Sequence, residues 1–272
     1  MSEARTMKEY HILLLDMLTE FHDFCKKNNL TYYMVGGTLL GAVRYGGFIP
    51  WDDDVDLAMP RKDYERLASI YEGSLSLHTY QNDREHMFPY TKLFSKKEPI
   101  VTVKDEEYNI NGQCFAQIDL YPIDGLGKCK DKALRHLSAV GRKKKFLFLN
   151  LTKSSSKNLT KRFLLFFIRR IPSRSIIRCI DKAMCKYTIE ESNFLTRWRE
   201  GGACPNAVPH EIFGTPVSIS FEGKSFSAPA DAHAYLTLVY GNYTVEKRCD
   251  AGLRHATMRN EISKKMAKDL TK

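Results

Sequence analysis

The amino-acid sequence predicts an α+β fold in which helices flank a mixed β-sheet. Patterns typical of helices and strands alternate over the first 125 residues, whereas the stretch from about 130 to 197 is mainly helical and rich in lysine and arginine. The remainder combines short strands with one more helix. The chain has 272 residues, of which 43% are hydrophobic, so it is long enough for one large domain or for a core with an insertion.

The first part of the chain begins with an amphipathic helix. Apolar residues recur at helical spacing over 5–27, and Asn28 or Asn29 is suited to the left-handed cap that ends this helix. A short buried strand is expected at 31–35, followed by a turn at two glycines and a helix that Thr38 would cap. Further elements are expected as strands at 55–59, 88–94, 99–103 and 116–124, a helix at 61–71 and a turn at 109–112.

The later part of the chain is first helical and then mixed. Pro172 separates two helices within the basic stretch, because proline interrupts a helix. Strands at 215–220 and 224–229 are expected to form a hairpin, and the helix that follows from 231 ends at Gly241.

Neither export nor membrane insertion is indicated by the hydrophobic segments. The N-terminal residues lack the basic and apolar segments of a secretory signal. The longest wholly apolar run, 163–168, is far shorter than the roughly twenty residues of a membrane span. We therefore expect a cytoplasmic protein. Its seven cysteines are an odd number without a CxxC pair, which argues against a disulfide framework and a zinc ribbon and predicts reduced, mostly buried thiols.

An acidic cluster follows a glycine-rich segment. It consists of Asp52, Asp53, Asp54 and Asp56. Alternate residues of a strand share a face, so three of these side chains would point one way and Asp53 the other if the strand begins early. Neighbouring carboxylates repel one another unless cations lie between them. Magnesium, or manganese in its place, suits such a cluster because it combines a few carboxylates with substrate phosphates.

A third carboxylate for this site is expected from a strand further along the chain. Asp119 lies between Ile118 and Leu120, where a charged side chain is unfavourable unless it has a partner or a function. Asp124, five residues after Asp119, is expected in a loop or as a cap.

The glycine turn adds a candidate phosphate site. Gly36, Gly37 and Thr38 lie between a predicted strand and a predicted helix, where backbone N–H groups and the helix dipole bind anions. Such a turn is common by itself, and an aspartate-rich run is usually a solvated loop or a calcium site. Here the run lies between Trp51 and the apolar strand 55–59. The combination of both motifs with a later strand aspartate therefore indicates metal-assisted phosphate chemistry.

These motifs resemble a known superfamily. The glycine turn followed by a D-x-D pair resembles the nucleotidyltransferases, and the longer segment 36–67 resembles the LicD family of phosphotransferases, which is related to fukutin. The family also carries a Lys-Leu pair on the next strand, here Lys92-Leu93, and motifs similar to those at 117–126 and 221–243. Tyr121 is a departure, because the family often has phenylalanine there. The resemblance covers about 10–125 and 210–250, and nothing is matched between them.

The resemblance implies a nucleotidyltransferase-like mixed-sheet core with a basic helical insertion. We expect a catalytic core at 1–127, a basic helical region at 128–200 and a C-terminal α+β segment at 201–272 that completes the core.

The resemblance also implies an activity and a set of site residues. The activity is transfer of phosphocholine, or a related phospho-alcohol, from CDP-choline or another CDP-alcohol to a sugar hydroxyl, with release of CMP. The acceptor would be a glycan of teichoic acid, lipopolysaccharide or capsule. Magnesium would be held by Asp54, Asp56 and Asp119, with Asp119 also able to orient the acceptor hydroxyl or take its proton. The donor phosphates would contact Gly36, Gly37, Thr38, Lys92 and Arg44.

Other interpretations stay open for the same residues. Lys92 would equally fit a surface cation on an edge strand, and Arg44 a solvated side chain. The enzyme could instead transfer the nucleotide itself to a small molecule or to RNA. In a third interpretation, the chain is a basic module that binds membranes or nucleic acid and keeps only a vestigial site.

The basic middle region has two further interpretations. Residues 128–186 contain 18 lysines and arginines against two acidic residues, a formal charge of +16. Ile176, Ile177, Ile180 and Met184 would share one face of a helix, and Arg174, Arg178 and Lys182 another. This helix would either pack on the core with a solvated charged face, or segment 161–186 would contact the inner face of a membrane that carries a lipid-linked acceptor. Nucleic acid is the least favoured partner, because no binding motif accompanies the charge.

Overall fold

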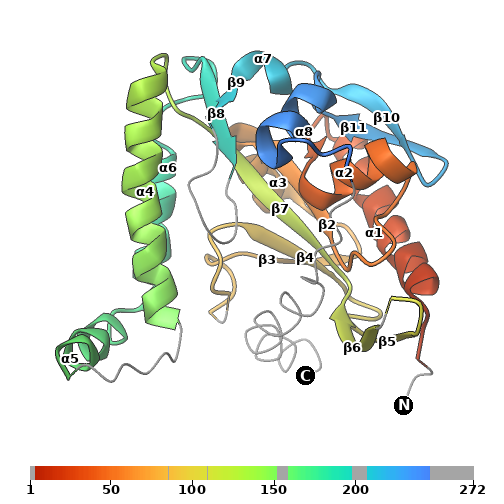
Figure 1. The fold of residues 1–272 in the computed structure, drawn as a ribbon, viewed down its shortest axis with the longest axis horizontal. Coiled ribbons are helices and arrows are strands. Elements are labelled where there is room, and N and C mark those ends of the chain that lie inside the picture. Colours follow the sequence, from red (N-terminus) through yellow and green to blue (C-terminus); the bar gives the residue numbers. More distant parts are fainter. Residues whose placement is uncertain (1–3, 85, 109, 152–158, 198–206, 246–272) are drawn as a thin grey trace. The chain divides into compact units, whose positions relative to one another are not determined.

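The computed structural model describes residues 4–84, 86–108, 110–151, 159–197 and 207–245 (Figure 1). Their contacts divide the chain into two compact units. The first unit comprises Met1–His78, Tyr90–Pro122 and Glu211–Lys272, and the second comprises Thr79–Pro89 and Ile123–His210. The architecture is α+β, as the sequence predicts, whereas the domain boundaries expected at 127 and 200 stay predictions.

The first unit is built on a sheet with the strand order β1-β2-β7-β4-β3. These strands are β1 (Tyr33–Met34), β2 (Val55–Pro60), β3 (Leu75–His78), β4 (Thr91–Ser95) and the first residues of β7 (Gln117–Gly125). β7 is buried along its whole length, so its side chains form the centre of the sheet. In the antiparallel pair β4–β7, Lys92 lies opposite Asp119.

The helices of this unit include α1 (Met7–Lys27), α2 (Gly36–Tyr45), α3 (Arg61–Ile70) and α8 (Ala232–Tyr240). α1 begins with a capping box, in which Thr6 and Glu9 each accept a hydrogen bond from the other's backbone N–H. The apolar stripe of α1 is buried, as its periodicity predicts, and Asn29 takes the left-handed conformation after its end. Gly241 ends α8 as expected.

Two antiparallel hairpins complete the first unit. They are β5 (Ile100–Asp105) with β6 (Ile110–Phe115), and β10 (Val217–Phe221) with β11 (Lys224–Ala228). The second hairpin and its turn at Glu222 lie where the sequence predicts them. The short helix α7 (His210–Phe213) precedes it.

The second unit combines three helices with short strands. Its helices are α4 (Lys130–Leu151), α5 (Leu159–Ile168) and α6 (Ser173–Met184). α4 and α6 lie side by side (Figure 1). The last residues of β7 pair with β8 (Phe194–Arg197), which pairs with β9 (Val208–Pro209). The isoleucine face predicted for α6 is buried, which confirms the interpretation that this helix packs on the core of its unit.

Several local predictions are wrong. Strand β3 was not predicted. The turn predicted at 109–112 lies earlier, at 106–108, and residues 110–112 belong to β6. Residue 109 lies outside the described residues. Thr38 does not cap α2, because the helix already begins at Gly36. Asp124 is not in a loop but is a buried residue of β7.

The cysteines are only partly as predicted. All five that the structure describes are free thiols, but Cys129, Cys179 and Cys185 are exposed and only Cys25 and Cys114 are buried. Cys179 lies on the outward face of α6, whereas Cys129 directly precedes α4 and Cys185 directly follows α6. Cys204 and Cys249 lie outside the described residues.

Candidate functional site

Three aspartates from two neighbouring segments come together at the centre of the first sheet. Asp54 directly precedes β2, Asp56 is the second residue of β2, and Asp119 is the third residue of β7. Each offers a carboxylate oxygen, and these oxygens lie within 4.8 Å of one another. Asp119 is fully buried and Asp54 is 6% exposed. Acidic groups crowded and buried in this way are stable only with cations or hydrogen-bond donors beside them.

A second group of acidic ligand atoms shares Asp54. Asp52, Asp53 and Asp54 also place one carboxylate oxygen each within 4.8 Å of one another. β2 begins at Val55, so these three residues precede the strand and the alternation expected for a strand does not apply to them. The predicted division, with Asp53 facing away, is therefore wrong.

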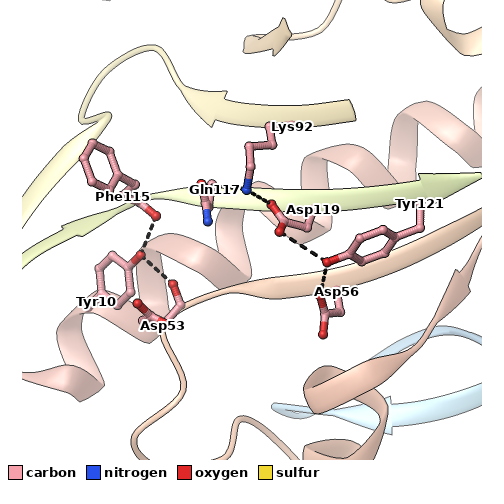
Figure 2. Close-up of polar contacts among 8 residues, drawn as sticks. All are labelled: Tyr10, Asp53, Asp56, Lys92, Phe115, Gln117, Asp119 and Tyr121. Atoms are coloured by element: carbon pink, nitrogen blue, oxygen red, sulfur yellow. Dashed lines mark hydrogen bonds and ion pairs between the residues drawn. The ribbon is translucent and has the colours of Figure 1, made fainter. Parts of the chain in front are cut away.

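Lys92 supplies a positive charge inside the acidic cluster (Figure 2). Its ammonium lies 2.6 Å from Asp119 Oδ1 and donates a second hydrogen bond to Gln117 Oε1 at 3.4 Å. The side chains of Lys92 and Asp119 are 1% and 0% exposed. β4 lies between β3 and β7, so Lys92 is neither on an edge strand nor at the surface, and that interpretation is wrong.

Tyr121 links the carboxylates of the two strands. Its hydroxyl lies 3.1 Å from Asp56 Oδ1 and 3.3 Å from Asp119 Oδ2 (Figure 2). A phenol has one proton, so it donates to one carboxylate at a time and holds the other close. In the sequence, Tyr121 stands out only as a departure from the family pattern. Its two-residue spacing from Asp119 on a strand was the available signal, because this spacing places both side chains on one face.

The glycine turn contacts the same carboxylates directly. The backbone N–H of Gly37 donates to Asp56 Oδ2 at 3.2 Å, and the N–H of Asp56 donates to the Thr38 hydroxyl at 2.8 Å. Gly36 has φ +57°, and a Cβ there would lie 2.1 Å from Asp56 Oδ2. A Cβ on Gly37 would lie 2.5 Å from Asp52 Oδ2. Both glycines are therefore needed for the carboxylates to lie against the N-terminus of α2, whose dipole favours negative charge.

Arg44 lies at the opposite end of α2 from the glycine turn. Eight residues separate it from Gly36, which is about 12 Å along a helix axis. Its guanidinium lies 5.3 Å from the centroid of the Tyr45 ring. The described contacts thus do not bring Arg44 to the three aspartates.

Residues from α1 and the β10–β11 hairpin hold the loop that carries the aspartates. The Tyr10 hydroxyl contacts the carbonyl oxygens of Asp53 and Phe115 at 3.0 and 2.8 Å. Glu222, at the hairpin turn, accepts a hydrogen bond from the backbone N–H of Phe48 at 3.0 Å. His11 Nε2 lies 2.8 Å from the carbonyl oxygen of Asp52. Burial lowers the pKa of His11 below its usual 6.5, so the ring is neutral at pH 7.

The comparison with protein families matches residues 29–159 to the nucleotidyltransferase domain described as LicD/FKTN/FKRP. This range contains the glycine turn, the three aspartates, Lys92 and Tyr121. It also extends beyond residue 125, so the similarity is longer than the motifs alone indicate.

Relatives support this match. The lipopolysaccharide cholinephosphotransferase LicD of Haemophilus influenzae is 27% identical over 248 residues, which cover 88% of this chain and 91% of that protein. An uncharacterised protein of Rickettsia prowazekii is 42% identical over 136 residues, covering 42% of this chain and 51% of that protein. The human ribitol 5-phosphate transferase FKRP is 47% identical over 47 residues, or 16% of this chain and 10% of that protein. The domain match shows that residues 29–159 form a nucleotidyltransferase domain of the LicD/FKTN/FKRP family, and the relative that covers most of the chain supports this assignment.

Proposed function

We propose that this protein is a metal-dependent phosphotransferase. It would move phosphocholine, or a related phospho-alcohol, from a CDP-linked donor to a sugar hydroxyl of a cell-surface glycan and release CMP. The observation that carries the proposal is the meeting of Asp54, Asp56 and Asp119 beside the glycine-lined N-terminus of α2. The likeness to a cholinephosphotransferase over 88% of the chain supports the choice of reaction.

The charges of the cluster fit a divalent metal ion. Asp54, Asp56 and Asp119 each offer a carboxylate oxygen, and these oxygens lie within 4.8 Å of one another, close enough for one ion to contact all three. Carboxylate oxygens are the ligands that magnesium and manganese prefer, and Asp54, Asp56 and Asp119 would hold the ion. When bound, such an ion neutralises the diphosphate of the donor and stabilises the charge on the departing phosphate.

The remaining residues would position the reactants. The N-terminus of α2, with Gly36, Gly37 and Thr38, offers backbone N–H groups and a favourable dipole to the donor phosphates. Lys92 holds the Asp119 carboxylate in place through a charge-assisted contact of 2.6 Å. Asp119 would also orient the acceptor hydroxyl. Arg44 lies in the last turn of α2, so it would contact the donor only at the end of this helix opposite the glycine turn.

The products distinguish the proposed reaction from its main rival. Purified protein is incubated with magnesium, a series of CDP-alcohols and a cell-envelope glycan extract that includes lipid-linked glycans. Release of CMP together with labelled glycan supports the phosphotransferase. Release of pyrophosphate from a nucleoside triphosphate would instead support a nucleotidyltransferase. Failure to bind magnesium with any CDP-alcohol would favour the interpretation of the chain as a binding module with a vestigial site.

Replacing Tyr121 with phenylalanine is expected to weaken metal binding about 10- to 100-fold. The variant keeps the ring but removes the hydroxyl that lies between Asp56 and Asp119, so the two carboxylates are less well ordered before the ion arrives. Calorimetric titration with manganese measures the effect without turnover. Tyr33→Phe is the matched control, because it removes a buried hydroxyl that donates to the carbonyl oxygen of Gly214. Equal metal affinity in wild type and Tyr121→Phe would contradict this role.

Replacing Gly36 with alanine is expected to abolish most of the transfer activity. The added methyl group would occupy the position of the Asp56 carboxylate, in addition to the strain of an alanine at φ +57°. Gly46→Ala is the control, because Gly46 has φ +69° but open space around its Cβ position. Both variants should lose about 1–2 kcal/mol of folding free energy from backbone strain. Urea denaturation and product assays together test the prediction, which fails if both variants are equally active.

A further inference from the structure

The second unit exposes aromatic side chains that its fold does not bury. Phe163, Phe166 and Phe167 on α5 are 68%, 49% and 51% exposed. Phe148, on the last turn of α4, is 52% exposed. No other phenylalanine of the described residues is exposed, so this feature is confined to one end of the α4–α5 pair.

The three phenylalanines of α5 form one face, which we call the aromatic patch. Their spacing of three and four residues places them on the same side of the helix. The ring of Phe167 packs edge-on against Phe163 and Phe166, with centroid distances of 4.9 and 5.6 Å. Leu165 and Ile168 on the other side are 9% and 6% exposed, so the helix already buries an apolar face within its own unit. The aromatic patch is thus a second apolar surface of this helix, and about half or more of each of its side chains is exposed.

Cations lie at the edge of the aromatic patch. Arg169 and Arg170 follow α5 directly and are exposed. The guanidinium of Arg170 lies 4.1 Å from the centroid of the Phe166 ring. The whole stretch 128–186 has a formal charge of +16. An apolar surface bordered by cations complements an anionic lipid surface, in which rings enter the interface and cations meet the headgroups.

A hydrogen-bonded turn fixes the aromatic patch on α4. The Asn150 side-chain amide donates to the carbonyl oxygens of Ile168 and Ile171 at 2.6 and 2.8 Å, and its oxygen accepts from the Ser173 hydroxyl at 2.6 Å. Asn150 therefore ties the end of α5 and the start of α6 to the last turn of α4. A surface held in this way loses little conformational entropy when it binds.

We propose that the aromatic patch of α5, with Arg169 and Arg170, binds the surface of a bilayer that contains anionic lipids. None of the described helices has the length and apolarity to cross a membrane, so the contact would lie in the plane of the interface. A second copy of the chain is disfavoured as the partner of the aromatic patch, because the two strongly positive regions would repel each other. Nucleic acid is disfavoured because the rings pack edge-on against one another, whereas bases stack on open ring faces.

The test measures sedimentation of the full chain with sucrose-loaded vesicles and does not depend on the proposed reaction. Vesicles of phosphatidylcholine alone are compared with vesicles that also contain phosphatidylglycerol. We expect binding to the anionic vesicles, and a loss of at least about tenfold in Phe163→Ser/Phe166→Ser/Phe167→Ser. The control Ile12→Ser/Val217→Ser/Val245→Ser, which changes exposed apolar residues elsewhere, should bind like wild type. Arg169→Gln/Arg170→Gln should weaken binding mainly at low salt.

The other outcomes overturn the proposal. Wild-type protein that does not sediment with anionic vesicles, or a triple serine variant that binds as well as wild type, would exclude the aromatic patch as a lipid contact. Binding to a single-stranded RNA oligonucleotide that the triple variant loses, without vesicle binding, would assign the patch to nucleic acid. A dimer that only the wild type forms, detected by size-exclusion chromatography, would assign the aromatic patch to contact between two copies of the chain. Circular dichroism spectra of all variants should match that of the wild type, because the replaced side chains are exposed.

Discussion

Replacing Asp56 with asparagine is expected to lower transfer about a thousandfold while the protein remains folded. Asp56 receives hydrogen bonds from Gly37 and Tyr121 and lies within ligand distance of Asp54 and Asp119. Asparagine keeps the size of the side chain and one acceptor oxygen, so the fold should tolerate it. It removes the negative charge that the proposed metal site needs, and a metal ion contributes several kcal/mol to such a reaction, at about 1.4 kcal/mol for each factor of ten.

The control for this variant is Asp16→Asn. Asp16 lies on the exposed face of α1, so the same chemical change there should leave both activity and folding as in the wild type. Initial rates of CMP release, circular dichroism and magnesium titration are measured for both variants. Full activity of Asp56→Asn would remove this carboxylate from the mechanism, and loss of folding in this variant would show that its charge is structural.

Replacing Lys92 with methionine is expected to destabilise the protein by about 3–5 kcal/mol. The ammonium group lies 2.6 Å from Asp119, and both side chains are almost completely inaccessible to solvent. Methionine fills a similar volume but removes the ammonium group that lies against the buried carboxylate of Asp119. A buried charge that loses its partner costs much more than the pair contributes. Urea denaturation measures the change in the free energy of unfolding.

A second substitution separates the lost pair from lost packing. In Lys92→Met/Asp119→Leu both charges are gone, so most of the lost stability should return although the proposed metal site is destroyed. Magnesium should also stabilise Lys92→Met more than it stabilises the wild type, because the ion replaces the missing positive charge and binds the folded state. If the double variant is as unstable as Lys92→Met, the cost arises from packing and not from an unpaired carboxylate.

Elements that depend on neighbouring residues were predicted well from the sequence. Four such predictions agree with the structure: the buried apolar stripe of α1, its left-handed end at Asn29, the β10–β11 hairpin and the end of α8 at Gly241. Capping, turn formation and helical periodicity act over a few residues, so the necessary information lies close together in the chain. The errors at Thr38 and 109–112 concern where an element begins, which tertiary contacts shift.

The α+β class, the family resemblance and the residue types of the glycine turn and the acidic cluster can all be predicted from the order of the amino acids. How these residues meet depends on the packing of distant segments. This packing places Lys92 against Asp119 and the Tyr121 hydroxyl between two carboxylates, and it leaves the phenylalanines of α5 outside the packed interior. Asp56 and Tyr121 are 65 residues apart in the chain, and they meet because of strand order and register, which no local pattern encodes.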